Sequence, residues 1–164
     1  MASIQKDIII DANPGDVWDA LRDFGALHTR LVPGFVTDTK LDGDARIVTF
    51  GNGTVAREIL IDCDDSKRRL AYAIISERIR QHSASAQVFD ASDGRTRFVW
   101  TADVLPNEIA PYMDAQMDLG VLAMALLGTT LLVLPLLDTG AAETLTSRRR
   151  AILQVPAAPA RVGS

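Results

Sequence analysis

Apolar and polar residues alternate with a period of about two through the middle of the chain, which is the pattern of β-strands. Runs rich in Val, Ile, Thr and aromatic residues lie between turn sequences such as Asp42-Gly43, Gly51-Asn52-Gly53 and Asp93-Gly94. The runs predict six strands, at about residues 35–41, 45–50, 54–62, 68–76, 80–90 and 95–104. Their close spacing is typical of an antiparallel meander.

The N-terminal segment predicts one further strand and two short helices. Residues 4–10 are rich in β-branched side chains, as strands are. Asn13 is placed as a helix N-cap, Pro14 suits the first helical position, and Gly25 is expected to end that helix. A second short helix is expected at about residues 26–31.

A long apolar helix is predicted after the meander. Between residues 107 and 127, apolar side chains recur three or four positions apart, at Ile109, Met113, Met117, Val121 and Met124. The order of elements predicts an α+β, helix-grip fold: a seven-stranded curved antiparallel sheet with two short helices and a long C-terminal helix. Sheet and helix should leave a hollow between them, and small-molecule pockets typically measure about 300–1,000 Å³.

Short motifs support this fold over about residues 3–125. They are Val17-Trp18, Leu21-Arg22-Asp23-Phe24-Gly25, Pro33-Gly34, Arg46-Ile47-Val48, Gly53 with Arg57-Glu58, Asp62, Arg69-Leu70 with Tyr72, and Val99-Trp100. In their order and spacing the sequence resembles the SRPBCC superfamily, in particular its polyketide cyclase/dehydrase and lipid-transport-like branch, related to START domains and the birch-pollen allergen. The resemblance implies ligand binding in an internal cavity. It implies no single chemistry, because the superfamily includes carriers, cyclases and hormone receptors.

Composition excludes several other classes of function. The chain has 164 residues, enough for one domain, and a net charge of −4, which disfavours nucleic-acid partners. Cys63 is the only cysteine, and His28 and His82 are the only histidines, so we expect no metal site. No dinucleotide or phosphate-binding motif occurs, and no other cofactor is expected. We see no signal peptide and expect a cytoplasmic protein.

Arg46, Glu58 and Tyr72 are the candidate catalytic residues. With a three-residue loop at Gly51 to Gly53, strand pairing puts Arg46 opposite Glu58, whereas a two-residue turn would separate them. On the concave face, the pair would be a polar anchor able to orient a ligand carbonyl or carboxylate, or to hold a proton during a cyclisation. On the outer face, it would be a structural ion pair.

The predicted ligand-binding residues are Phe50, Tyr72, Ile74, His82, Trp100, Met113 and Met117. Five of the seven also have a simpler interpretation. Tyr72 is alternatively a core tyrosine, Trp100 plain core, and His82 a partly exposed histidine, as His28 is. The methionines suit a pocket for varied apolar ligands but equally suit core packing.

The C-terminal part departs from the family pattern. Leu119 to Leu137 carries no charge and, as a helix, would be about 28 Å long, close to the thickness of a bilayer core. Such a segment is interpreted as an extension that packs on its own domain, as the contact of a homodimer, or as a membrane anchor. The predicted division is a ligand-binding domain at 1–127, an apolar helix extension at 128–150 and a flexible tail at 151–164.

Three functions are compatible with these patterns. The preferred one is a carrier or sensor that binds a hydrophobic small molecule, such as a lipid or a polyketide-like or aromatic compound. The second is a cyclase or dehydratase that uses the polar cavity residues. The third is a membrane-attached or protein-interaction module acting through residues 119–137.

Overall fold

A seven-stranded antiparallel sheet forms the body of the protein, as predicted. The computed structural model describes residues 1–133, and the side chains of residues 1–126. The strands are β1 (Ala2–Ile10), β2 (Val36–Asp42), β3 (Ala45–Phe50), β4 (Val55–Asp64), β5 (Arg69–Ile74), β6 (Gln81–Asp90) and β7 (Thr96–Leu105). Their order in the sheet is β1-β7-β6-β5-β4-β3-β2, so the first strand pairs with the last.

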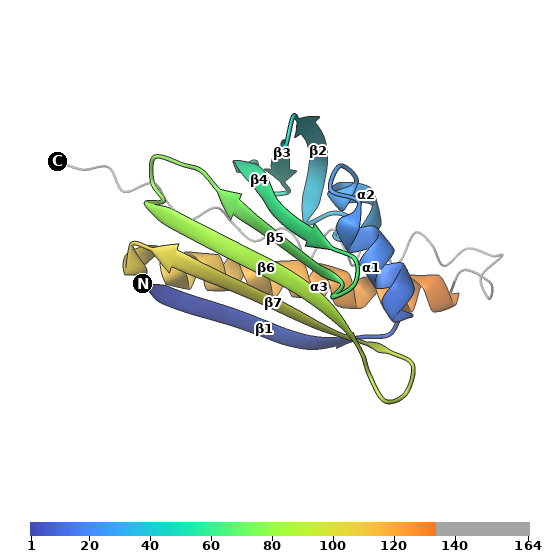
Figure 1. Ribbon diagram of the computed structural model, residues 1–164. Coiled ribbons are helices and arrows are strands. Elements are labelled where there is room, and N and C mark those ends of the chain that lie inside the picture. The colour runs from blue at the N-terminus through green and yellow to red at the C-terminus, as the bar shows by residue number, and fades with distance from the viewer. Residues whose placement is uncertain (134–164) are drawn as a thin grey trace.

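The helices cover one face of this curved sheet. They are α1 (Pro14–Arg22), α2 (Leu27–Arg30), the 3-10 turn η1 (Asn107–Ile109) and α3 (Ala110–Val133). Figure 1 shows α3 running along the sheet beside β1 and β7, with α1 and α2 gathered towards one end. This arrangement is the predicted α+β helix-grip fold.

Helix boundaries differ from the prediction at two places. Asn13 caps α1 as expected, since its Oδ1 accepts from the Gly15 amide at 2.8 Å, but the helix ends at Arg22 instead of Gly25. The Phe24 carbonyl is used by a tertiary contact, a hydrogen bond from Arg46 Nη1 at 3.2 Å, which local sequence cannot show. At the other end of the chain, the helix predicted from residue 107 begins as the 3-10 turn η1 and becomes α3 only at Ala110, and it continues to Val133, into the predicted helix extension.

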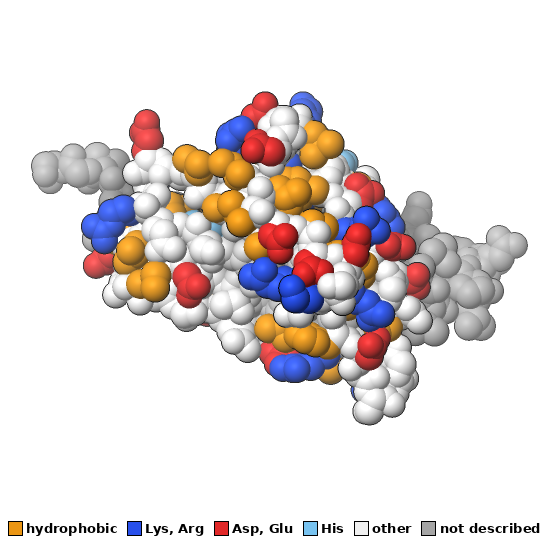
Figure 2. All heavy atoms as spheres, in the orientation of Figure 1, with side chains coloured by type: hydrophobic (Ala, Val, Ile, Leu, Met, Phe, Trp, Pro, Cys, Tyr) orange, Lys and Arg blue, Asp and Glu red, His pale blue; other side chains and the backbone are white. Residues whose placement is uncertain are grey.

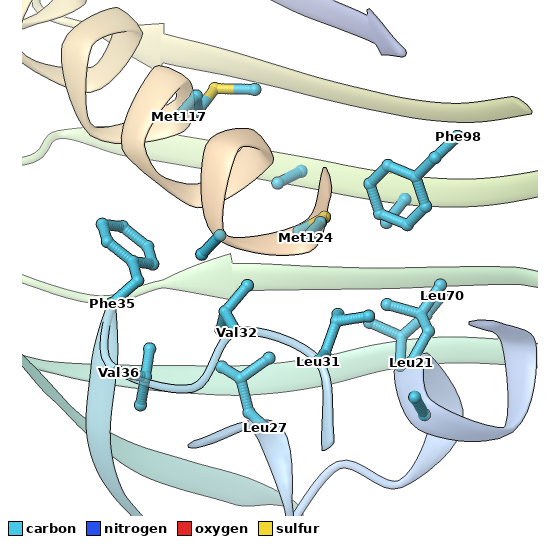
Figure 3. Close-up of a cluster of buried hydrophobic side chains, with 14 of the residues drawn as sticks. Leu21, Leu27, Leu31, Val32, Phe35, Val36, Leu70, Phe98, Met117 and Met124 are labelled. Atoms are coloured by element: carbon cyan, nitrogen blue, oxygen red, sulfur yellow. The ribbon is translucent and has the colours of Figure 1, made fainter. Parts of the chain in front are cut away.

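The hydrophobic core lies between the concave face of the sheet and the helices. Alternate residues of β7, including Phe98, Ala102 and Val104, point inwards and are buried. Figure 3 shows side chains from α1, α2, β7 and α3 meeting in this layer, among them Leu21 and Met124. The apolar faces of the strands and of the helices therefore pack together in a single core.

A glycine brings α3 close to the sheet. A Cβ atom at Gly120 would lie 2.8 Å from Trp100 Cζ3 and 3.3 Å from Phe35 Cε1, so a larger residue would have to push these rings away. Charge pairs add to this contact: Lys6 of β1 reaches Asp114 at 2.7 Å and Asp118 at 2.5 Å on α3. The helix is thus fixed along the β1–β7 edge.

The opposite face of the sheet is a mixed surface. Figure 2 shows hydrophobic side chains gathered over β4 and β5, close to basic and acidic side chains. Ile61 of β4 and Ile75, just after β5, are among the exposed apolar residues. The enclosed space described below lies on the other side, between sheet and helices.

Candidate functional site

A largely apolar pocket lies between the concave face of the sheet, α2 and α3. Its free volume is about 80 Å³, smaller than the predicted range but enough for several water molecules or a small organic group. Of the predicted site residues, eight line it: Arg46, Phe50, Glu58, Tyr72, Ile74, Trp100, Met113 and Met117. The structure thus brings all three candidate catalytic residues to one wall.

Small side chains on β6 create part of this space. Ala84 and Ala86 occupy consecutive inward positions of β6, between Tyr72 on β5 and Trp100 on β7. Above these alanines, Trp100 Nε1 donates a hydrogen bond to the Tyr72 hydroxyl oxygen at 3.1 Å. Two large aromatic residues therefore bridge a strand whose own side chains are too short to fill the hollow.

The Arg46–Glu58 pair lies at the polar end of the pocket. The hairpin closes with Phe50 N–H donating to the Thr54 carbonyl at 2.8 Å, which leaves a three-residue loop, and Arg46 stands opposite Glu58. Of the two turns that the sequence left open, the three-residue loop is the one found. Glu58 Oε2 lies 2.7 Å from Arg46 Nε and 2.6 Å from Nη2. Both side chains line the pocket, which corresponds to the concave alternative.

Phe24 completes the surroundings of the guanidinium and was not among the predicted residues. Arg46 Cζ lies 4.0 Å from the centre of the Phe24 ring, within the range of a cation–π contact. Together with the bond to the Phe24 carbonyl and the pair with Glu58, this contact fixes the Arg46 side chain in one orientation. The polar end is therefore a rigid feature of the pocket.

Burial changes the ionisation of two residues here. Burial, reinforced by the negative charge of Glu58, raises the pKa of Tyr72, so its phenol keeps its proton at neutral pH. Burial likewise lowers the pKa of His82 to about 4, so the imidazole is uncharged at neutral pH. Neither side chain carries a charge near the Arg46–Glu58 pair under ordinary conditions.

His82 does not line the pocket, although the sequence predicted it to contact ligand. Its Nδ1 accepts a hydrogen bond from the Ile74 amide at 3.1 Å, and its ring centre lies 5.8 Å from that of Tyr72. Residue pairing between β5 and β6 ends at Tyr72 and Ala84. Beyond this pair, the imidazole of His82 is the hydrogen-bond partner of the Ile74 amide. In this structure His82 supports the strand that carries Tyr72 and Ile74.

The remaining lining residues were not predicted. They are Leu21, Leu27, Leu31, Val32, Phe35, Val36, Leu70, Ala86, Phe98, Gln116 and Met124. Phe98 and Leu70 alternate with predicted residues on their strands, so the period of two could have found them. No sequence pattern distinguishes Gln116, which reaches the pocket only because α3 lies where it does.

The described residues hold no other candidate centre. Within residues 1–133, no group of three or more histidine, cysteine, aspartate or glutamate side chains is placed to hold a metal ion. In that same part of the chain, no helix has both the length and the apolar character needed to cross a membrane. Residues 134–137 of the apolar run, most of the predicted extension and the predicted tail lie outside the described residues.

The comparison with protein families agrees with this geometry. Residues 1–125 match the family described as polyketide cyclase / dehydrase and lipid transport. The chain therefore belongs to this family, as the sequence motifs predicted. No curated protein matches the sequence significantly.

Solved structures of similar fold come from several bacteria. An uncharacterized protein from Bacillus thuringiensis has a TM-score of 0.70 at 18% identity, and the match covers 78% of this chain and 99% of that one. The protein XoxI from Bacillus cereus has a TM-score of 0.64 at 21% identity, over 78% and 92% of the two chains. A protein from Thermobifida fusca has a TM-score of 0.63 at 29% identity, over 76% and 91%. These likenesses show that the chain shares the fold of these proteins.

Proposed function

We propose that this protein binds a hydrophobic small molecule in the pocket between sheet and α3, and acts as a carrier or sensor for it. The observation that carries the proposal is the pocket itself: apolar walls with the buried Arg46–Glu58 pair and Tyr72 at one end. Apolar walls supply affinity, and a few fixed polar groups orient the ligand. The small free volume implies that a larger ligand must displace flexible side chains such as Met113 and Met117.

Native mass spectrometry of the purified protein tests this directly. We expect an apolar compound to co-purify and to be released on denaturation. As a defined probe, 1-hexanol should shift the NMR signals of pocket residues.

A matched pair of variants locates the binding. Ala86→Leu fills the hollow and should weaken 1-hexanol binding at least tenfold, because the free volume is removed. Ser83→Leu adds the same side chain on the exposed face of the same strand and should leave binding unchanged. Equal binding by both variants would place the ligand elsewhere and contradict the proposal.

A cyclase or dehydratase is the second candidate, because the geometry brings Arg46, Glu58 and Tyr72 together. Tyr72 keeps its proton and could act only as an acid or donor, which leaves the Glu58 carboxylate as the base. A precursor of the co-purifying compound is incubated with the protein, and the product distinguishes the two candidate functions. A carrier returns the compound unchanged in mass and chromatographic retention, a dehydratase returns it with the loss of one water, and a cyclase returns an isomer of the same mass with a different retention time.

Two further predictions concern partners and location. A homodimer or a membrane contact through Leu119 to Leu137, and a cytoplasmic location, remain predictions from the sequence. Light scattering on the purified full chain, with and without lipid vesicles, would detect either association.

A further inference from the structure

Glu58 uses only one of its two carboxylate oxygens. Both close contacts from Arg46 go to Oε2. Among the described side chains, no donor forms a hydrogen bond to Oε1. Among the described residues, the enclosed polar side-chain atoms without a partner are His28 Nδ1 and Thr39 Oγ1, so an unbonded Oε1 is accessible, and Glu58 lines the pocket. The pocket therefore presents an available acceptor.

Tyr72 has an available donor. Its oxygen accepts from Trp100 Nε1, and an indole nitrogen can only donate, so the phenol hydrogen is not used in that bond. Within the described part of the chain, no residue accepts the phenol hydrogen. Tyr72 is buried and lines the pocket, so this hydrogen is available to a ligand.

The acceptor and the donor lie at the same end of the pocket. Glu58 stands opposite Ile74, and Tyr72 lies two residues before Ile74, so Glu58 and Tyr72 are diagonal neighbours on one sheet face. The guanidinium group of Arg46, whose Nε donates to Glu58, has its Cζ atom 5.7 Å from the centre of the Tyr72 ring. The two side chains therefore border neighbouring parts of the same pocket.

The charge of this end selects against ionic groups. Arg46 and Glu58 neutralise each other, so a bound carboxylate would bring a second negative charge beside Glu58 with no free cation to balance it. A bound ammonium group would meet the opposite difficulty beside Arg46. Burial of an unpaired charge is costly, whereas a hydroxyl group brings one donor and one acceptor without charge.

We propose that the polar end of the pocket recognises an uncharged hydroxyl group, so that the ligand is an apolar alcohol or phenol and not a carboxylic acid. The ligand O–H donates to Glu58 Oε1, and the ligand oxygen accepts from the Tyr72 phenol. This inference rests on the proposed function and narrows it. It decides against the carboxylate among the ligand groups that the sequence left open.

Three small probes test the inference on the wild-type protein: 1-hexanol, butyl ethyl ether and hexanoate at pH 7.5. The ether has the same atoms as the alcohol but no O–H, and hexanoate carries the charge. By NMR titration, 1-hexanol should bind about threefold to tenfold more tightly than the ether, the value of one hydrogen bond. It should bind at least tenfold more tightly than hexanoate, because the anion is left unpaired.

Substitution of Glu58 should reverse the preference. Glu58→Gln leaves the charge of Arg46 free, so hexanoate should become the tighter ligand. Asp118→Asn removes a carboxylate from the Lys6 cluster, outside the pocket, and should leave the order of affinities unchanged. Tyr72→Phe keeps the ion pair and should weaken both 1-hexanol and the ether, since both accept from the phenol.

The outcomes separate this inference from the function on which it rests. Hexanoate binding as tightly as 1-hexanol to the wild-type protein would overturn the choice of a hydroxyl group and leave the binding function standing. Equal affinity for 1-hexanol and the ether would show that Glu58 Oε1 accepts no hydrogen bond from the ligand. This result would also overturn the choice of a hydroxyl group and leave the binding function standing. Failure of all three probes, with no compound co-purifying, would overturn the binding function itself.

Discussion

Two groups of ion pairs lie on the concave side of the sheet, and they differ in their exposure to water. The side chains of Arg46 and Glu58 are 6% and 5% exposed. Lys6 is 15% exposed, and its partners Asp114 and Asp118 on α3 are 51% and 62% exposed. The same chemistry therefore has two roles: at the edge it helps to hold a helix, and in the interior it forms the polar end of a pocket.

The difference follows from solvation. A buried pair has lost its water, so each member depends on the other, and removing one leaves a charge without compensation. Exposed carboxylates keep their water and lose little when the pair opens. The proposed recognition of a hydroxyl group rests on this buried pair, in which Glu58 bonds to Arg46 through Oε2 alone.

The largest effect is expected from breaking the buried pair. Glu58→Leu should lower the free energy of unfolding by about 3–5 kcal/mol, because Arg46 is left buried and unpaired. Urea unfolding followed by circular dichroism measures this loss. The double variant Arg46→Met/Glu58→Leu should recover most of it, and a double variant as unstable as the single one would contradict the explanation.

His82 should make the pocket region sensitive to acid. Because the folded-state pKa is lowered to about 4 from its ordinary value near 6.5, the unfolded chain takes up a proton first as the pH falls. Stability should therefore be lost between about pH 6.5 and pH 4, by up to about 3 kcal/mol.

His82→Asn isolates this contribution, since asparagine keeps an acceptor for the Ile74 amide. Carboxylates titrate in both the wild type and the variant, so the difference between their pH–stability curves gives the contribution of His82 to stability. Parallel curves over this interval would show that His82 is not the group responsible.

Packing of α3 should matter more than its ion pairs. Gly120→Ala places a Cβ 2.8 Å from Trp100 Cζ3 and should cost about 1–3 kcal/mol through overpacking. Thermal unfolding measures the loss. Ala115→Gly, at an exposed position of the same helix, should cost about 1 kcal/mol through helix propensity alone. This control measures how much helix propensity contributes to an exchange between glycine and alanine in α3. Stabilisation by Gly120→Ala would mean that the helix moves away from Trp100 without cost.

The smallest effect is expected at the exposed cluster. Lys6→Met should change the free energy of unfolding by about 0.2–1 kcal/mol per pair lost, and the change should fall at high salt because exposed charges are screened. Urea unfolding at low and high sodium chloride measures both. A loss as large as that of Glu58→Leu would remove the distinction between the two clusters.

Local patterns were sufficient for most of the fold. The alternation in residues 95–104 placed Phe98 and Trp100 inwards. The sequence allowed two turns at Gly51 to Gly53, and the three-residue loop is the one that pairs Arg46 with Glu58. These features depend on neighbours in sequence or on a single hairpin, so the chain itself specifies them.

Other features of the site depend on residues that are distant in sequence. His82 was predicted to contact ligand and shares the inward parity of Ala84 and Ala86, yet it bonds to the Ile74 amide because β5 and β6 stop pairing there. Gln116 and Phe24 reach the site only through the placement of α3 and the loop after α1. No periodicity in the local sequence predicts these contacts.

The sequence by itself determined the order of strands and helices along the chain and the family, and it narrowed the register of Arg46 and Glu58 to two hairpin alternatives. Only the tertiary structure decided that this pair borders a pocket, that Glu58 leaves Oε1 unbonded, and that the free volume is about 80 Å³. The physical reason is the sequence separation of the residues involved. Alternation and turns depend on near neighbours in the sequence. The shape and charge of a cavity depend on side chains that meet only after the sheet has curved and α3 has packed against it.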